Sequence, residues 1–382
     1  WAVILWRLSM NSKSGFFLRL AQSGLQNLSP YKPGKPIEEL ERETGKGDLV
    51  KLASNENPLG PPGRVLAAIS KEHGNLARYP DGGAFYLKQK LSERLGVPSE
   101  MITLGNGSND VLEMLARAFL GPGTEAIVSE HCFVVYPLLT KALGADLVEI
   151  QTSDFQPDLD RTLKSISEKT RMIFLANPNN PTGTWISKEE IIPFMNNLPS
   201  SILVVLDEAY YEYVNSQHYP NGIDLQRDYE NLIVTRTFSK AYGLAGLRIG
   251  YSVSNPEIAD LMNRIRQPFN VNSLSLVAAS LALDEMDFLS ESISINNDGM
   301  KFLEQTFSRL DLQYIPSAGN FLTVDLGQNA LPIYELLLQK GIIVRPIGVY
   351  GLPNHLRVSI GLPRENERFS VALAEVLNNF QS

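Results

Sequence analysis

The sequence predicts an α/β fold in which a mainly parallel sheet is covered by helices on both faces. Three apolar runs, residues 172–176, 202–206 and 232–235, recur about thirty residues apart, the length of a strand–helix–strand unit. A capping box at residues 187–190 (Ser-Lys-Glu-Glu) opens a helix between the first two runs. Continuous apolar strands that alternate with helices are typical of parallel sheets.

The length of 382 residues exceeds one ordinary domain, so we expect two domains. Residues 47–272 are expected to form the larger domain around the parallel sheet. Residues 273–382 are expected to form a smaller α+β domain, with helices to about Leu310 and short strands after it. Residues 1–46 are expected to be an N-terminal arm and linker, proline-rich from position 30 to 36, that forms part of the smaller domain.

The composition describes a globular protein and argues against several classes. Hydrophobic residues make up 43% of the chain and charged residues 20%. The net charge of −8 and the lack of a long basic run argue against nucleic-acid binding. Cys132 is the only cysteine, which excludes an internal disulfide and fits a cytoplasmic location. The four histidines lack metal-ligand spacing, so no metal is expected.

The first nine residues are apolar but do not predict a membrane segment. They are too few to span a bilayer, and they lack a basic start and a small-residue cleavage site. We expect residues 1–9 to be an extension upstream of Met10. The alternative is a short arm that packs on a partner subunit.

Polar residues follow each of the three apolar runs. The first run leads into residues 177–183 (Asn-Pro-Asn-Asn-Pro-Thr-Gly), the second into Asp207 and Glu208, and the third, a few residues on, into Ser239 and Lys240. Ligands bind beyond the carboxyl ends of the strands in open parallel sheets. We therefore expect the three polar clusters to meet in one crevice.

Lys240 indicates chemistry with a carbonyl cofactor. It lies between Ser239 and a small-residue turn, and Arg248 follows eight positions later. A lysine that loses its charge on burial suits Schiff-base formation with a carbonyl, while neighbouring hydroxyls and an arginine would suit a phosphate. These features together suggest pyridoxal 5′-phosphate (PLP). The alternative is a surface lysine in a Gly/Ala loop.

A second phosphate-binding feature precedes a helical pattern at residues 105–110 (Gly-Asn-Gly-Ser-Asn-Asp). The N–H groups at a helix start bind phosphate, and Gly107 would let the backbone approach closely. The alternative is an ordinary helix cap by Ser108 or Asn109.

Four further side chains suit a flat, protonated ring. Asp207 ends an apolar strand, where an unpaired carboxylate is costly, and a pyridinium nitrogen would be its natural partner. Tyr210 and Asn180 would bond a ring hydroxyl, and Phe133 would stack on the ring. The alternatives are capping or arginine pairing for Asp207, core packing for Tyr210 and Phe133, and a plain Asn-Pro turn for Asn180.

The chain resembles the fold type I PLP-dependent aminotransferases. Residues 180–183 (Asn-Pro-Thr-Gly), residues 207–210, and Ser239-Lys240 with Arg248 occur in the order and spacing of that family. Within it, the chain is most similar to the histidinol-phosphate aminotransferase group. The segments that carry this likeness are Ser29-Pro30-Tyr31, 52–62, 78–82 and 356–361, and the resemblance extends from about Pro30 to the C-terminus.

The resemblance implies a role for each cofactor-site residue. Lys240 would bind PLP and move a proton to and from the substrate, Asp207 would hold the pyridinium proton, and Asn180 and Tyr210 would bond the ring oxygen. Phe133 carries over only a stacking role, because many members have tyrosine there. The residues implied in holding the cofactor phosphate are Ser108, Asn109, Thr237, Ser239 and Arg248.

The resemblance also implies how substrates and subunits are bound. Arg357 would bind the anionic end of the substrate, assisted by Arg345, Tyr31 and Asn55. Arginine suits either a carboxylate or a phosphate, and the alternative for Arg345 is a structural ion pair. Tyr79 would reach the cofactor phosphate of the neighbouring subunit, which implies a homodimer with shared active sites.

The activity that the resemblance implies is amino transfer between L-histidinol phosphate and 2-oxoglutarate, in histidine biosynthesis. One alternative is an aminotransferase acting on aromatic amino acids. Another is a decarboxylase of the threonine-phosphate type, which shares the cofactor site. A non-catalytic PLP-binding module is disfavoured, because the site looks complete.

Overall fold

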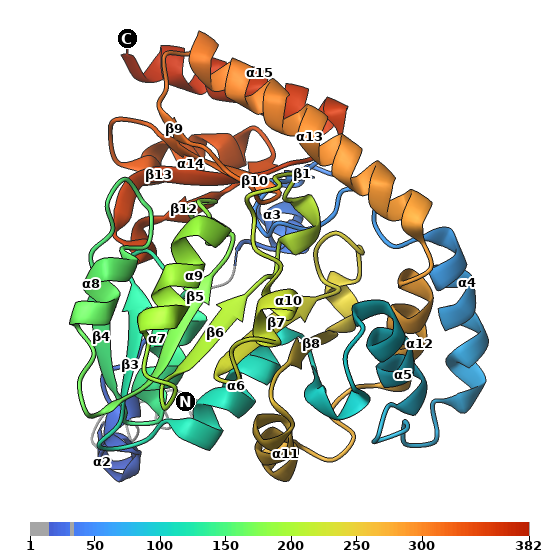
Figure 1. Ribbon diagram of the computed structural model, residues 1–382. Helices are drawn as coiled ribbons and strands as arrows, with labels where there is room; N and C mark the ends of the chain where they lie inside the picture. Colours follow the sequence, from blue (N-terminus) through green and yellow to red (C-terminus); the bar gives the residue numbers. More distant parts are fainter. Residues whose placement is uncertain (1–14, 31–33, 382) are drawn as a thin grey trace.

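The computed structural model describes residues 15–30 and 34–381, and its centre is a seven-stranded sheet (Figure 1). The strand order is β2-β8-β7-β6-β5-β3-β4. The strands are Ile102–Gly105 (β2), Glu125–Ser129 (β3), Asp146–Ile150 (β4), Thr170–Ala176 (β5), Leu203–Asp207 (β6), Leu232–Thr237 (β7) and Gly250–Val253 (β8).

The predicted fold class is confirmed by this sheet. Strands β3 to β7 are mutually parallel, and β8 runs antiparallel between β2 and β7. The three apolar runs are β5, β6 and β7, which are neighbours in the sheet. Their carboxyl ends therefore meet at one edge, as the sequence predicts.

Helices cover both faces of the sheet because its apolar residues alternate sides. In β5, Ile173 and Leu175 pack into one core, while Met172 and Phe174 pack into the other. The first core receives α4, α5, α9, α10 and α12, and the second receives α6, α7 and α11. The helices around the sheet are Gly63–Glu72 (α4), Phe85–Leu95 (α5), Ser108–Phe119 (α6), Val135–Ala142 (α7), Leu159–Lys164 (α8), Lys188–Asn197 (α9), Gly222–Gln226 (α10), Pro256–Ile265 (α11) and Ser273–Ala282 (α12).

The predicted capping box is present at the start of α9. The Ser187 side chain and the Glu190 carboxylate each satisfy a backbone N–H of the other residue. The first turn of the helix is thereby closed where the sequence places it.

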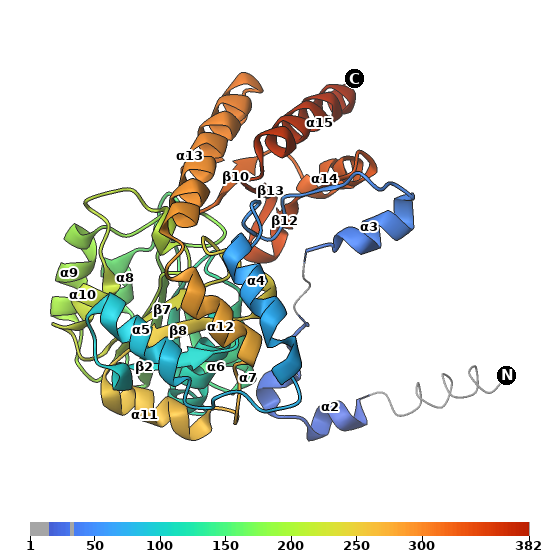
Figure 2. The same cartoon turned by 90° about the vertical axis from the view of Figure 1, so that its right-hand side faces the viewer.

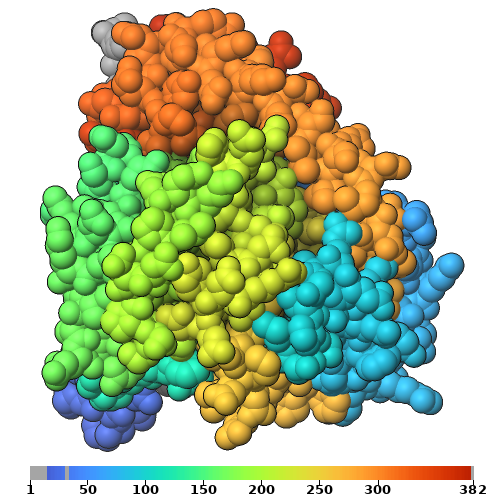
Figure 3. Space-filling view, in the orientation of Figure 1, coloured from blue at the N-terminus to red at the C-terminus, as the bar shows by residue number. Residues whose placement is uncertain are grey.

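A smaller antiparallel sheet, in the order β12-β13-β10-β9, lies above the strand ends of the larger one (Figure 1). The space-filling view shows the two parts in contact (Figure 3). A separate two-stranded parallel pair joins β1 to β11. The elements of this part are Ile37–Thr44 (α3), Val50–Lys51 (β1), Met286–Arg309 (α13), Tyr314–Ile315 (β9), Phe321–Asp325 (β10), Ala330–Gln339 (α14), Ile342–Ile343 (β11), Arg345–Ile347 (β12), Leu352–Ser359 (β13) and Pro363–Gln381 (α15).

The core packing bears on the predicted domain limits. Helix α12 packs on α4 and α5 in the core of the larger sheet, and α13 then crosses to the core of the smaller one. Val50 and Leu52 also belong to the smaller core. The limits at residues 46/47 and 272/273 stay predictions, and this packing favours assigning α12 to the larger part and β1 to the smaller part.

The N-terminal region is described only in part. Residues 1–9 and Tyr31 lie outside the described residues, so the predictions on them are unchanged. Helix α2 (Phe16–Leu20) has no buried residue, and it lies with α3 along one side of the molecule (Figure 2). No helix in the described part of the chain is long and apolar enough to cross a membrane.

A buried ion pair joins the ends of β6 and β7. Glu208 accepts hydrogen bonds from Arg236 Nε at 2.8 Å and from the backbone N–H of Gly222 at 2.8 Å. The Tyr211 ring lies 3.5 Å from the guanidinium carbon. Because Glu208 directly follows Asp207, this pair fixes the strand end that carries a predicted site residue.

Replacing Arg236 with methionine should lower the free energy of unfolding by about 3–5 kcal/mol, because Glu208 would stay buried without its charge partner. Urea unfolding followed by circular dichroism measures this loss. The Arg236→Met, Glu208→Gln double variant is the control, and it should be more stable than Arg236→Met. A loss below about 1 kcal/mol in the single variant would contradict the role given to the pair.

Candidate active site

A cavity of about 360 Å³ lies at the carboxyl ends of β5, β6 and β7. The last residue of each strand, Ala176, Asp207 and Thr237, lines it. The smaller sheet closes the opposite side. The structure thus brings together most of the predicted site residues: Asn55, Ser108, Asn109, Phe133, Asn180, Asp207, Tyr210, Thr237, Ser239, Lys240, Arg248, Arg345 and Arg357.

Two predicted residues stand apart from this cavity. Tyr79 is 82% exposed and stacks on Phe269, with ring centroids 4.6 Å apart. Gly107 is not part of the cavity wall but lies behind Arg248. The structure therefore brings Tyr79 into no contact with the cavity of its own chain.

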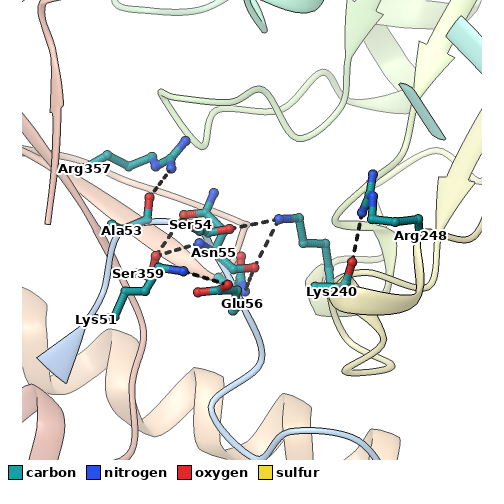
Figure 4. A network of polar contacts seen from close by, with 11 residues as sticks. Lys51, Ala53, Ser54, Asn55, Glu56, Lys240, Arg248, Arg357 and Ser359 are labelled. Atoms are coloured by element: carbon teal, nitrogen blue, oxygen red, sulfur yellow. Dashed lines mark hydrogen bonds and ion pairs between the residues drawn. The ribbon is translucent and has the colours of Figure 1, made fainter. Parts of the chain in front are cut away.

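Lys240 lies in the middle of the cavity. Its Nζ donates to the carbonyl oxygens of Ser54 and Asn55, each at 3.2 Å (Figure 4). Figure 4 shows Arg248 on one side of the amine and Arg357 on the other. The amine is thus held between two guanidinium groups.

The surroundings disfavour a charge on this amine. Burial and, next, the positive charge of Arg357 lower the pKa of Lys240 to about 7. Glu56 and Asp207 oppose the shift but do not cancel it. A neutral amine, which can act as a nucleophile or base, is therefore well populated near neutral pH.

Asp207 is 4% exposed and is held by two hydroxyls. Tyr136 Oη donates to Oδ2 at 2.7 Å and Thr235 Oγ1 donates to Oδ1 at 3.0 Å. Burial raises the pKa of the Asp207 carboxyl, while these hydrogen bonds lower it. A positively charged partner inside the cavity would favour its ionised form.

One end of the cavity has the character of an anion site. Helix α6 starts there with Gly107 at the N-cap, and neither Ser108 nor Asn109 caps it by its side chain. A Cβ at Gly107 would lie 2.4 Å from Arg248 Nη2, so only glycine leaves room for this arginine. Arg248 Nη1 also donates to Ser239 Oγ at 3.3 Å. The N–H groups of the helix start and a guanidinium thus converge on one point.

Arg248 and Asn55 have strained or unusual backbones. Both have a φ of 54°, in the left-handed region, which asparagine tolerates and arginine rarely adopts. Such geometry persists where surrounding contacts hold it. In Asn55, Ser359 Oγ donates to Oδ1 at 3.0 Å and accepts from the backbone N–H at 2.8 Å.

The opposite end of the cavity carries two arginines. Arg345 on β12 and Arg357 on β13 are directly paired across the antiparallel ladder, so both side chains leave the same face of the small sheet. Arg357 Nη2 donates to the Ala53 carbonyl oxygen at 2.7 Å, and Nη1 donates to Asn180 Oδ1 at 2.6 Å. The structure therefore places both arginines on neighbouring strands, and both line the cavity.

Asn180 and Tyr210 meet in the cavity, as the resemblance implies. Tyr210 Oη accepts from Asn180 Nδ2 at 3.2 Å and from Asn55 Nδ2 at 3.0 Å. The order Arg357–Asn180–Tyr210–Asn55 forms one chain of hydrogen bonds across the cavity floor. It links the arginine end to the segment that contacts Lys240.

Several residues that line the cavity were not predicted from the sequence. Tyr136 contacts Asp207, and its signal was its position three residues after Phe133, a spacing that puts both rings on one side of a helix start. Lys51 and Tyr350 also line the cavity. Lys51 directly precedes residues 52–62, one of the segments that carry the resemblance, but no motif marks Tyr350. No group of three or more metal-ligating side chains occurs in the residues that the structure describes.

The profile of the aminotransferase class I and II family matches residues 47–373, which include both sheets and all the residues that line the cavity except Gly34 and Pro36. The chain belongs to this family of aminotransferases. The enzyme class implied by the motifs is therefore confirmed, and Lys240 with its surroundings is the candidate centre of an aminotransferase.

The relatives of this aminotransferase include well-matched full-length proteins. Histidinol-phosphate aminotransferase 2 of Pseudomonas fluorescens is 56% identical over 366 residues, covering 95% of this chain and 99% of the relative. Histidinol-phosphate aminotransferase 2 of Pasteurella multocida is 53% identical over 361 residues, covering 94% and 99%.

A solved structure is similar over almost the whole fold. The crystal structure of histidinol-phosphate aminotransferase from Sinorhizobium meliloti, in complex with pyridoxal 5′-phosphate, has a TM-score of 0.87. It is 32% identical and covers 94% of this chain and 98% of its own. The similarity covers both the larger and the smaller sheet.

The pKa of Lys240 predicts how its amine reacts in the cofactor-free protein. Its acylation by acetic anhydride should rise with pH to a plateau with a midpoint near 7, because only the neutral amine reacts. Ordinary lysines should follow a midpoint near ~10.4. Peptide mapping by mass spectrometry measures both. Arg357→Met should move the Lys240 midpoint to higher pH, and a midpoint unchanged from that of surface lysines would contradict the electrostatic account.

Proposed function

We propose that this aminotransferase uses PLP to transfer the amino group of L-histidinol phosphate to 2-oxoglutarate, in histidine biosynthesis. The observation that carries the proposal is the position of Lys240 between two cationic ends of one cavity. The names of the relatives that match nearly the full chain support the donor, and the dicarboxylate acceptor is consistent with two arginines at one end.

The cavity residues fit PLP. A phosphate fits the start of α6, where Gly107 leaves Arg248 beside the helix N–H groups. A protonated ring nitrogen fits Asp207, whose buried carboxylate is hydrogen-bonded to two hydroxyls and to no cationic side chain among the described residues. Phe133 offers a flat apolar face on the same wall. When bound, PLP supplies an aldehyde carbon that bonds to amines and a ring that withdraws electrons.

Lys240, Asn180 and Tyr210 are given the roles that the resemblance implies. Lys240 Nζ would hold the cofactor, and it would accept and return the proton of the substrate's α-carbon. Its pKa of about 7 suits both directions of proton transfer near neutral pH. Asn180 and Tyr210, already hydrogen-bonded to each other, would orient the ring oxygen.

Arg345 and Arg357 are proposed to bind the anionic group of each substrate. The reaction is of the ping-pong type, so the same cavity accepts a phosphate ester and then a dicarboxylate. A planar guanidinium serves either anion. Asn55 is proposed to assist from below, since it is fixed between Ser359 and Tyr210, and Tyr31 is proposed to close the cavity from the N-terminal arm.

We propose a homodimer with shared active sites, located in the cytoplasm. Exposed aromatic side chains support the proposal that a second subunit covers this surface. Tyr79 stacks on Phe269 at the surface, and Tyr86 is 78% exposed. The single, buried cysteine fits the cytoplasm. In this arrangement Tyr79 contributes to the cofactor phosphate site of the neighbouring subunit.

Mixed dimers test the sharing of active sites. The Lys240→Ala variant and the Tyr79→Ala variant, each inactive alone, should regain activity when mixed. A hybrid dimer contains one site with both native residues. Turnover after subunit exchange, with exchange shown by mass-tagged subunits, is the measurement. Exchange without any recovery would contradict a contribution of Tyr79 across the interface.

Substrate preference tests the proposed activity. The purified PLP-loaded enzyme should turn over histidinol phosphate with a higher kcat/KM than phenylalanine, forming glutamate from 2-oxoglutarate without releasing CO2. Arg345→Ala should weaken the reaction of histidinol phosphate by roughly 1.5–3 kcal/mol, as expected for a lost charged hydrogen bond, and that of phenylalanine less. A higher kcat/KM for phenylalanine would replace the proposal with an aromatic aminotransferase, and CO2 release would replace it with a decarboxylase.

A further inference from the structure

A third cation stands beside the two arginines at the outer end of the cavity. Lys51 lines the cavity together with Arg345 and Arg357. It lies on β1, where it pairs in register with Ile343 of β11. Arg345 lies two residues beyond Ile343, at the start of β12. Three strands, β1, β12 and β13, thus each contribute one basic side chain to the wall of the cavity.

Arg357 and Lys51 differ in how firmly they are held. Arg357 is fixed by the Ala53 carbonyl and by Asn180, and it is buried. Lys51 forms an ion pair with Glu56, with Nζ 2.9 Å from Oε1. Figure 4 shows this pair next to the carbonyls that receive Lys240. Unlike Arg357, Lys51 therefore has an exchangeable partner and a flexible stem.

The Lys51–Glu56 pair costs little to open. The side chains are 21% and 45% exposed, so Glu56 stays hydrated when its partner leaves. Ion pairs of this exposure contribute at most about 1 kcal/mol. A dianion with several acceptor oxygens competes well for the ammonium, because charge-assisted hydrogen bonds are stronger.

The two proposed substrates differ in how they distribute their charge. A phosphate monoester carries close to two negative charges and three acceptor oxygens on one group. A dicarboxylate carries one charge on each of two separate groups. Two arginines balance a single carboxylate amply, whereas a phosphate offers charge and oxygens for a third cation.

We propose that Lys51 determines specificity for the phosphate-bearing donor. Its ammonium group breaks the ion pair with Glu56 and binds the phosphate of the donor, and the ion pair forms again when the dicarboxylate acceptor is bound. This inference rests on the proposed function, because it assumes a phosphorylated donor. The Lys51–Glu56 pair then lets one cavity bind two anions of different charge in turn.

Binding of two simple anions to the PLP-loaded enzyme tests this inference without turnover. Isothermal titration calorimetry with inorganic phosphate and with succinate compares the two charge distributions. Lys51→Met should weaken phosphate binding about tenfold, the effect of one lost charge-assisted hydrogen bond, and leave succinate binding within about twofold. Lys51→Arg is the matched control and should recover most of the phosphate affinity. Equal weakening of both anions, or of neither, would overturn the inference.

Glu56→Gln provides a second test, which starts from a variant that keeps Lys51. It should strengthen phosphate binding, because Lys51 then has no ion pair to break before it binds the phosphate. In the Lys51→Met background the same change should have no effect on phosphate binding. A direct repulsion between the Glu56 carboxylate and the phosphate would instead give the same gain in both backgrounds. A persistent gain would overturn the exchange.

Turnover separates this inference from the proposed function. If the unmutated enzyme does not use histidinol phosphate, the proposed function fails whatever Lys51 does. If the enzyme does use histidinol phosphate, but Lys51→Met affects phosphate and succinate binding equally, the inference on Lys51 alone fails. With both intact, Lys51→Met should raise the KM for histidinol phosphate about tenfold, with kcat and the KM for 2-oxoglutarate within about twofold.

Discussion

The site depends on placing one lysine amine where a positive charge is disfavoured. Burial of Lys240 disfavours the charged amine most, and the repulsion of Arg357 and Arg248, between which the amine lies, adds to this effect. The pKa of the amine falls to about 7 as a result. The cations that disfavour a charged lysine also attract anions to both ends of the cavity, so one electrostatic arrangement serves nucleophilicity and binding together.

The sheet supplies the rigidity that this arrangement requires. Strands β5, β6 and β7 end at the cavity, and the buried pair of Glu208 and Arg236 fixes the last two relative to each other. Asp207 is the last residue of β6, and Lys240 lies three residues after the end of β7. The arginine end, in contrast, comes from the smaller sheet. The cavity is therefore built between two parts of the chain, each with its own core.

Much of the larger part could be predicted from local sequence. The apolar runs of β5 to β7 are continuous because both faces of these strands are buried, and the polar residues after them mark the strand ends. The Ser187 capping box is a purely local signal and marks the start of α9. The cofactor-site residues on these elements were found for the same reason.

Other features depend on contacts between segments distant in sequence. Tyr136 contacts Asp207 across 71 residues, and Asn55 contacts Ser359 across 304. Lys51 joins the arginines only because β1 pairs with β11. The capping alternative for Ser108 and Asn109 did not hold, because Gly107 is the N-cap of α6 and the helix begins at Ser108. No periodicity or motif encodes such contacts.

The most direct test of the account is to identify the lysine that binds PLP. The enzyme loaded with PLP is reduced with borohydride, digested, and mapped by mass spectrometry. We expect the pyridoxyl group on the peptide that contains Lys240, whose amine has a pKa of about 7. Lys51 lines the same cavity and serves as the internal control. A label on Lys51 or on any other lysine, with Lys240 unmodified, would contradict the account.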